Sequence, residues 1–250
     1  MGYMKNILVY TNPAKKFHEE NVPLIKIHID NSLELGWHRP DILLFTNFEY
    51  EYHGVKAKVV SDSLQCTFDK TSNKIIVIND LLQKGLLQRD LYWYHDFDAY
   101  QNNIMTESEL GLEEFDLGLT GYEYKPQWNG GSFFFKRTAK SIFKMWAENL
   151  VKINRTRADE KTMTDMTRDG SMKPFKYKEM NITYNFGQRC PKLCYEIADK
   201  PLKVLHFHPY YKFYPKDCSN IDVFMHGKNK HNIPMMSKRL IKLFKKYGIQ

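Results

Sequence analysis

Buried strands and amphipathic helices alternate along the first hundred residues of this 250-residue chain. Short β-rich apolar runs predict the strands, and apolar residues at helical spacing, closed by glycine, predict the helices. Such an alternation favours an α/β fold with a largely parallel sheet, whose ligands lie beyond the carboxyl ends of the strands. The predicted strands are residues 5–11, 41–46, 55–60 and 91–96, and the predicted helices are residues 24–35 and 74–84.

The second half of the chain is less regular. The sequence predicts strands at residues 117–122 and 203–207, a turn at 127–132 before the apolar residues 133–135, and helices at 139–152, 159–168 and 235–247. No stretch resembles a linker. The length therefore fits one domain of two halves.

The chain is basic, with 37 Lys and Arg against 29 Asp and Glu, a net charge of +8. This balance favours anionic partners, and nucleotide, nucleic acid and anionic membrane surfaces all remain open. Much of the excess falls in residues 228–246, where a solvated basic helix also explains it. No apolar stretch approaches the roughly 18 residues of a membrane span and the N-terminus lacks signal-peptide features, so we expect a cytoplasmic protein with free thiols at its four cysteines.

Two carboxylates follow the aromatic strand at residues 91–95. Asp96-Phe97-Asp98 is a common spacing, but an apolar run that ends in acidic side chains needs a cation to compensate them. Residues two apart on an extended strand point to the same side, so Asp96 and Asp98 can face one site while Phe97 packs behind. A divalent metal completed by a substrate diphosphate is the simplest compensator, and a pair that only caps a turn is the alternative.

Two further segments could contribute to a site. In Asn129-Gly130-Gly131-Ser132 the glycines allow close approach of a ligand and Asn129 offers an amide to hydroxyl groups, although a plain hairpin turn would look the same. Asp159-Glu160 opens a predicted helix and could supply a general base, although acidic residues at a helix start are usually a capping preference.

The late strand ends in His206-Phe207-His208. Two imidazoles two apart can both face a metal, and a hydrogen-bonded histidine is the commoner alternative. Lys212 follows in an aromatic loop and could reach a diphosphate as a point charge. The aromatic residues of 210–214, together with Trp128, could stack on a saccharide or belong to the core.

The order of these features resembles glycosyltransferases of the GT-A fold. The segment Val204-Leu205-His206-Phe207 with Lys212 is similar in spacing to the terminal His-Phe and Lys of glycogenin-like and related bacterial sugar transferases. The resemblance spans residues 5–212 and implies an α/β fold: a single GT-A domain with a Rossmann-like mixed central sheet flanked by helices. It implies a nucleotide-binding half at about 1–100, an acceptor and metal half at about 101–215, and a basic tail helix at 216–250.

The resemblance also implies roles for individual residues. Asp98 and His206 would bind Mn²⁺, with Mg²⁺ as a second possibility, His208 as the alternative ligand and Asp96 at the metal or the ribose. The remaining contacts would be Lys212 to the donor diphosphate, Tyr10, Thr11 and Asn12 to the nucleoside, and Asn129, Gly130 and Gly131 to the sugar and acceptor. The implied donor is a nucleotide sugar, UDP-linked before GDP-linked, and the acceptor a saccharide or glycan hydroxyl.

The acidic helix start departs from one pattern of the family. Retaining members commonly have Asp-Gln there, whereas this chain has Asp159-Glu160, which suits the base of an inverting transfer. A phosphohydrolase of the haloacid-dehalogenase type is one alternative, although its acidic pair normally follows the first strand. A nucleic-acid-binding protein without catalysis is the other, but the sequence contains no recognisable recognition module, so we expect no nucleic-acid partner.

Overall fold

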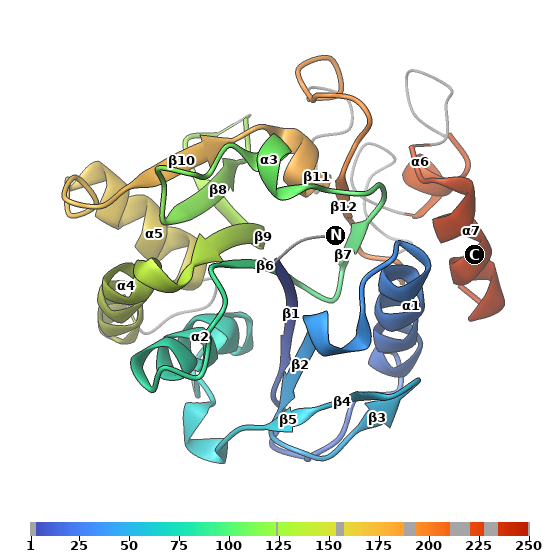
Figure 1. Cartoon of the computed structure of the whole chain (residues 1–250), viewed down its shortest axis with the longest axis horizontal. Coiled ribbons are helices and arrows are strands. Elements are labelled where there is room, and N and C mark those ends of the chain that lie inside the picture. The colour runs from blue at the N-terminus through green and yellow to red at the C-terminus, as the bar shows by residue number, and fades with distance from the viewer. Residues whose placement is uncertain are drawn as a thin grey trace.

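The computed structural model describes residues 4–123, 125–153, 158–187, 194–210, 221–227 and 235–249. A seven-stranded sheet in the order β10-β8-β9-β6-β1-β2-β5 forms its centre (Figure 1). Every pairing is parallel except those of β9, which runs antiparallel to β6 and to β8. The strands are β1 (Lys5–Tyr10), β2 (Ile42–Thr46), β5 (Lys58–Val59), β6 (Leu91–His95), β8 (Leu117–Gly121), β9 (Trp128–Lys136) and β10 (Tyr177–Met180).

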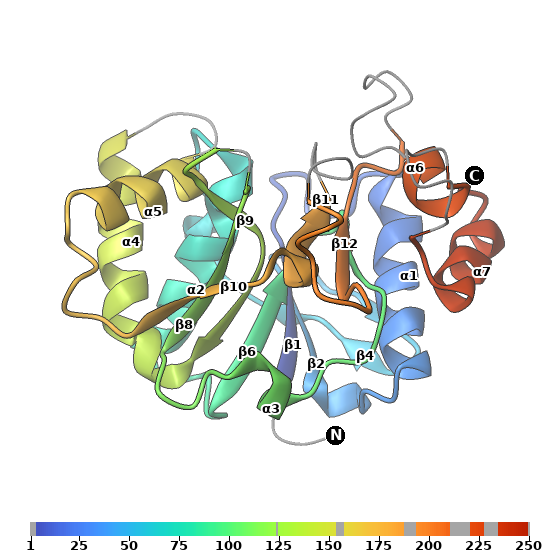
Figure 2. The ribbon, with the colours of Figure 1, turned by 90° about the horizontal axis from the view of Figure 1, so that it is seen from above.

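Helices cover both faces of this sheet (Figure 2). One face packs on α2 (Asn73–Gln83), α4 (Lys140–Ile153) and α5 (Ala158–Arg168), and the other on α1 (Asn21–Glu34). Along β6, Tyr92 and Tyr94 enter the first core while Leu91 and Trp93 enter the second. Because alternate side chains point to opposite faces, a strand buried on both sides reads as one continuous apolar run. The predicted α/β fold with a mixed central sheet is therefore confirmed.

A second, three-stranded sheet lies against α1. Its order is β11-β12-β7, with β12 antiparallel to β7, and α6 and α7 pack outside it (Figure 2). Near the end of α7, Lys246 Nζ lies 2.7 Å from Asp30 Oδ2 of α1. This part of the chain comprises β7 (Ala99–Gln101), β11 (Phe186–Gly187), β12 (Val204–His206), α6 (Ile221–Met225) and α7 (Lys238–Lys246). The remaining short elements are β3 (Glu51–Tyr52), β4 (Val55–Lys56) and α3 (Glu107–Leu110).

Several local predictions were wrong. Residues 127–132 form no turn, because β9 runs unbroken from Trp128 to Lys136. The strand predicted at residues 55–60 is two short strands, β4 and β5, in different sheets. Cys66 is a free cysteine as expected, whereas Cys194 is disulfide-bonded.

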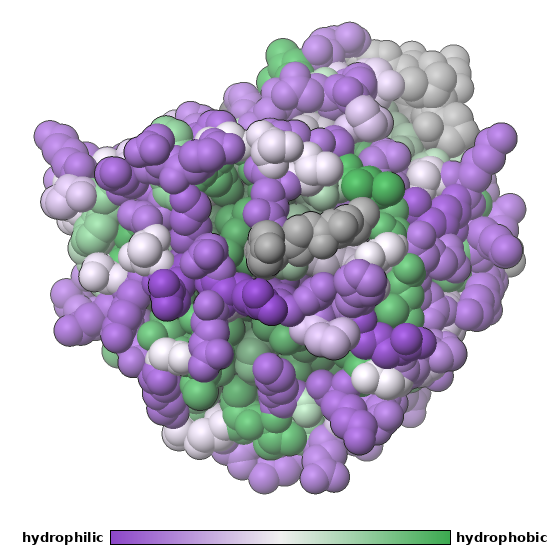
Figure 3. Space-filling model, viewed as in Figure 1, coloured by the Kyte–Doolittle hydropathy of each residue, from purple (hydrophilic) through white to green (hydrophobic). Residues whose placement is uncertain are grey.

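The surface is predominantly polar. Figure 3 shows hydrophilic residues over most of the face seen in Figure 1, with hydrophobic residues gathered in separate areas between them. None of the helices in the described ranges is long and apolar enough to cross a membrane.

One buried hydroxyl offers a test of the packing of β8. Thr120 is 1% exposed, and its Oγ1 has no hydrogen-bond partner among the described residues. Burying an unpaired hydroxyl costs about 1–3 kcal/mol, so Thr120→Val should raise the free energy of unfolding by about that amount, measured by chemical denaturation. Thr183 is a matched control, because it is equally buried but donates to the carbonyl of Asp199 at 2.8 Å. Thr183→Val should lower stability, and equal effects of the two substitutions would contradict the argument.

Candidate active site

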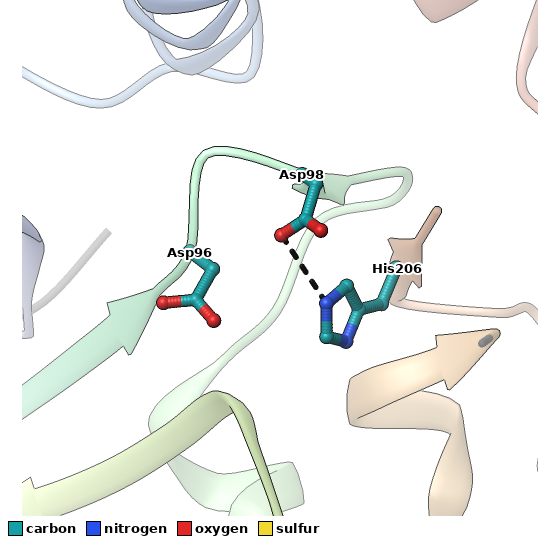
Figure 4. Close-up of side chains that lie close together, drawn as sticks. All are labelled: Asp96, Asp98 and His206. Atoms are coloured by element: carbon teal, nitrogen blue, oxygen red, sulfur yellow. Dashed lines mark ion pairs between the residues drawn. The ribbon is translucent and has the colours of Figure 1, made fainter. Parts of the chain in front are cut away.

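The Asp-x-Asp pair lies in a tight turn between β6 and β7. The amide of Asp96 donates to the carbonyl of Gly131 at 2.8 Å, and the amide of Ala99 donates back to the carbonyl of Asp96 at 3.1 Å. The sequence suggested that the two carboxylates lie on one side of an extended strand, but the structure places them in a turn. The turn nevertheless directs both towards the same space (Figure 4). Phe97 packs behind, with its ring 5.2 Å from that of Tyr10.

His206 reaches this space from the end of β12. The strand pairs antiparallel with β7, which sets His206 opposite Ala99, and the amide of Phe207 donates to the carbonyl of Asp98 at 2.8 Å. The Nε2 atom of His206 lies 3.2 Å from Asp98 Oδ1, and the Nδ1 atom of His206 lies 2.9 Å from Asn185 Oδ1. Donation from Nδ1 to the Asn185 oxygen would leave Nε2 unprotonated and directed at the carboxylates, as a metal ligand requires.

These residues fit a divalent cation. Ligand atoms of Asp96, Asp98 and His206 all lie within 4.8 Å of one another. Carboxylate oxygens and an imidazole are donors that suit Mn²⁺ and Mg²⁺. His208 lies beside the group rather than within it, because its Nδ1 contacts Asp98 Oδ2 at 2.8 Å. Of the two predicted histidines, His206 is the one that the fold brings to both carboxylates.

A buried lysine that the sequence analysis missed links the acidic turn to α5. Lys74 is 3% exposed, and its Nζ lies 3.0 Å from Asp96 Oδ2 and 2.9 Å from Asp159 Oδ2. The hydroxyl of Tyr94 also donates to Asp96. Lys74 lies in the first turn of α2, where a positive charge is unfavourable for the helix dipole. That misplaced charge was the available signal that an acidic partner lies nearby.

The electrostatics of the site follow from burial and from these pairs. Burial would raise the pKa of Asp98, but the imidazoles of His206 and His208 outweigh it and hold that pKa well below the usual range. Burial would lower the pKa of His206, and Asp98 reverses this and raises it. At Asp96 and Asp159 burial dominates and raises both pKa values, although Lys74 opposes the shift.

The two glycines of β9 make room for the site. A Cβ on Gly131 would lie 2.0 Å from Cε1 of His206, and a Cβ on Gly130 would lie 2.8 Å from Asp159 Oδ2. Asn129 is buried between strands, where its Oδ1 accepts from the amide of Gly131 at 3.0 Å. The glycines expected to border a ligand therefore border the site's own side chains.

The two carboxylates at the start of α5 have different surroundings. Asp159 is 2% exposed and paired with Lys74, which leaves it a poor position for receiving a proton from a substrate. Glu160 is half-buried and accepts from three groups: the Tyr122 hydroxyl at 2.7 Å, the Gly130 amide at 3.1 Å and Gln127 Nε2 at 3.2 Å.

A pocket of about 300 Å³ opens beside Asp96. Its lining includes Tyr10, Thr11 and Asn12, the residues expected to hold a nucleoside, as well as Lys74 and Asp96. The side chain of Asn73 donates to Thr11 Oγ1 at 2.7 Å and so fixes this wall. Lys212, expected at a diphosphate, lies outside the described residues.

The fold is that of known glycosyltransferases. The glycosyltransferase GlyE of Streptococcus pneumoniae TIGR4 aligns with a TM-score of 0.57 and 15% identity over 86% of this chain, which spans 58% of the GlyE chain. An active-site mutant of LgtC aligns with a TM-score of 0.55 and 13% identity over 97% of this chain and 95% of its own. LgtC, a galactosyltransferase, was also solved with donor and acceptor sugar analogues, and that structure aligns with a TM-score of 0.50 and 16% identity over 84% of this chain and 90% of its own.

No protein-family model and no curated protein sequence matches the chain. The structural alignments with GlyE and LgtC nevertheless confirm, at the level of the fold, the expected resemblance to GT-A glycosyltransferases.

Replacing Gly131 tests the metal centre. In Gly131→Ala the new methyl group would overlap the imidazole of His206 and displace it. We expect Mn²⁺ affinity, measured by isothermal titration calorimetry, to fall about 10- to 100-fold, the usual effect of disturbing the support of a ligand. Gly85→Ala is the control, because it also adds a methyl group to a glycine but meets no atom within 4 Å, and its own strain at a φ of +67° lies away from the site. Equal Mn²⁺ affinity in the two variants would count against His206 as a ligand.

Proposed function

We propose that the protein is a metal-dependent glycosyltransferase that moves a sugar from a nucleotide diphosphate donor to a hydroxyl of a saccharide or glycan acceptor. One observation carries the proposal: in a fold shared with GlyE and LgtC, Asp96, Asp98 and His206 converge next to a pocket formed at the end of β1. Ligands of open α/β sheets bind at such carboxyl ends.

The donor would bind along the pocket beside β1. Tyr10, Thr11 and Asn12 would hold the nucleoside, with UDP the first donor to test and GDP the second. Asp98, His206 and Asp96 would hold Mn²⁺ or Mg²⁺, which when bound stabilises negative charge on the departing diphosphate. Lys74 would favour the ionised form of Asp96 and orient its carboxylate through the 3.0 Å contact.

Glu160 is the better candidate for the base. An ionised carboxylate offers roughly four acceptor positions, and the three donors of this structure leave one for an acceptor hydroxyl. The oxygen of that hydroxyl would attack the sugar on the side opposite the diphosphate, while the hydroxyl proton passes to Glu160. The anomeric centre would be inverted. Asp159 would instead position Lys74.

The alternatives gain no specific support. Phosphohydrolases of the haloacid-dehalogenase type have their acidic pair after the first strand, whereas here it follows β6. Nucleic-acid binding rested on the net charge of +8 and on the 16 Tyr and 16 Phe that could stack on bases. Much of that charge lies in the tail, and part of it points inward, since Arg239 donates to Asn31 and Asn102.

Asp98 provides the test of metal dependence. Asp98→Asn keeps the size of the side chain but removes the charge that faces both histidines. We expect Mn²⁺-dependent hydrolysis of a nucleotide sugar, chosen by screening UDP- and GDP-sugars, to fall at least about a hundredfold, since metal stabilisation supplies several kcal/mol. Glu148→Gln on the exposed face of α4 is the control. A rate near that of the wild type in Asp98→Asn would refute the assignment.

The stereochemistry tests the role of Glu160. Proton abstraction by a positioned side chain contributes about 10²- to 10⁴-fold, so Glu160→Gln should lower kcat by a factor in that range. NMR of the first-formed product should show an anomeric configuration opposite to that of the donor. Retention of configuration would exclude Glu160 as the base of a single displacement while leaving glycosyl transfer itself intact.

A further inference from the structure

A second and larger hollow lies on the other side of β9 from the donor pocket. Its volume is about 510 Å³, within the range of about 300–1,000 Å³ typical of small-molecule sites. The loop after β8, the second half of α5 and Glu179 of β10 form its walls. Because β8 and β6 are both antiparallel to β9, their carboxyl ends share one edge of the sheet. This hollow and the acidic turn therefore open at the same edge.

One side chain connects the hollow to Glu160. Gln127 lines it, and its Nε2 donates to Glu160 Oε2 at 3.2 Å. The other oxygen of Glu160 accepts from the amide of Gly130. A Cβ added to Gly130 would lie 3.4 Å from Lys74 Nζ. A molecule in the hollow would thus be separated from the Glu160 carboxylate by the side chain of Gln127, with the cluster of Lys74 beyond Glu160.

Trp128 gives the hollow a rigid aromatic wall. Its Nε1 donates to Thr167 Oγ1 at 2.9 Å, and its backbone amide donates to Thr164 Oγ1 at 3.2 Å. The ring of Tyr177 meets it edge-on, with centroids 6.3 Å apart and planes at 89°. Trp128 is only half-buried, so part of the indole is available for contact. A fixed aromatic side chain supplies contact area at little cost in conformational entropy.

The charges around the hollow balance. Glu123 and Glu179 line it together with Lys125 and Arg168, two acidic residues and two basic ones. Burial, with the neighbouring charge of Glu179, raises the pKa of Glu123. Such a lining offers both donors and acceptors but no net charge for a phosphate. Hydroxyl groups, which donate and accept, match it better than an anion does.

We propose that this hollow binds a neutral pyranose ring of the acceptor saccharide, stacked on Trp128, hydrogen-bonded by Glu179 and held beside Gln127, the side chain that contacts Glu160. The inference rests on the proposed glycosyl transfer and adds to it the location and the chemical class of the acceptor. It also gives Gln127 a role, because this side chain lines the hollow and donates to Glu160.

Binding can be measured without turnover. We would record saturation-transfer NMR of methyl glycosides of glucose, galactose, mannose and N-acetylglucosamine with the full chain, in the presence of Mn²⁺ and UDP. At least one glycoside should bind, and Trp128→Ala and Glu179→Gln should each weaken its affinity about tenfold or more. Trp128→Phe should retain most of the affinity. Glu148→Gln, a glutamate on the exposed face of α4, is the matched control for Glu179→Gln.

Kinetics with the best glycoside separate the two proposals. The hollow is supported if Glu179→Gln raises the acceptor KM about tenfold while the donor KM changes less than about twofold. If the wild type hydrolyses a nucleotide sugar but Trp128→Ala and Glu179→Gln leave glycoside affinity and acceptor KM unchanged, the acceptor assignment is overturned and glycosyl transfer stands. If glycosides bind in the hollow but no nucleotide sugar is turned over, the proposed function fails and saccharide binding remains. Should Trp128→Ala prove unstable in thermal denaturation, Glu179→Gln alone decides.

Discussion

The ammonium group of Lys74 holds the candidate site together. It joins the acidic turn after β6 to the start of α5, because Lys74 Nζ lies 3.0 Å from Asp96 Oδ2 and 2.9 Å from Asp159 Oδ2. The three side chains are largely removed from solvent. Removing one member of a buried pair is costly because it leaves an uncompensated charge, so these three elements depend on one another. When ionised, Asp96, Asp98, Asp159 and Glu160 place four negative charges around the one positive charge of Lys74. A divalent cation at Asp96, Asp98 and His206 would offset part of this excess.

Burial and the neighbouring histidines explain how these carboxyl groups bind protons in the chain alone. Asp96 and Asp159 have raised pKa values because of burial, so the native state holds protons that the unfolded chain has already lost. Stability contributed by these two groups therefore falls as pH rises through their native pKa values. The contribution of Asp98 to stability depends on pH in the opposite direction, because His206 and His208 hold the pKa of Asp98 low. Its contribution is present above the unfolded pKa and is lost as pH falls.

How far the sequence predicts this site depends on where each residue lies in its element. The Asp pair follows a buried strand of the central sheet, where ligands are expected at the carboxyl ends of parallel strands. His206 ends β12 of the second sheet, antiparallel to β7, and only the resemblance to GT-A glycosyltransferases joined it to the pair. Lys74 was missed because a lysine in an amphipathic helix normally faces water. Residues 127–132 were misread because paired glycines also signal turns, and only the packing of His206 and Asp159 against the strand reveals the reason for them. The spacing of Asp96 and Asp98 fitted a strand as well as a turn.

The direction of β9 explains how the cation site and the acidic start of α5 come to lie at one edge of the sheet. As the antiparallel member of the central sheet, it begins at the edge where β6, β8 and β1 end, which places Asn129, Gly130 and Gly131 in the middle of that edge. Successive residues of a strand face opposite sides. Gly130 therefore approaches Asp159 and Glu160 while Gly131 approaches His206. A side chain at Gly130 would collide with Asp159, and one at Gly131 would collide with His206. The absence of side chains at these two positions thus lets the cation site and the acidic start of α5 pack against opposite sides of one strand.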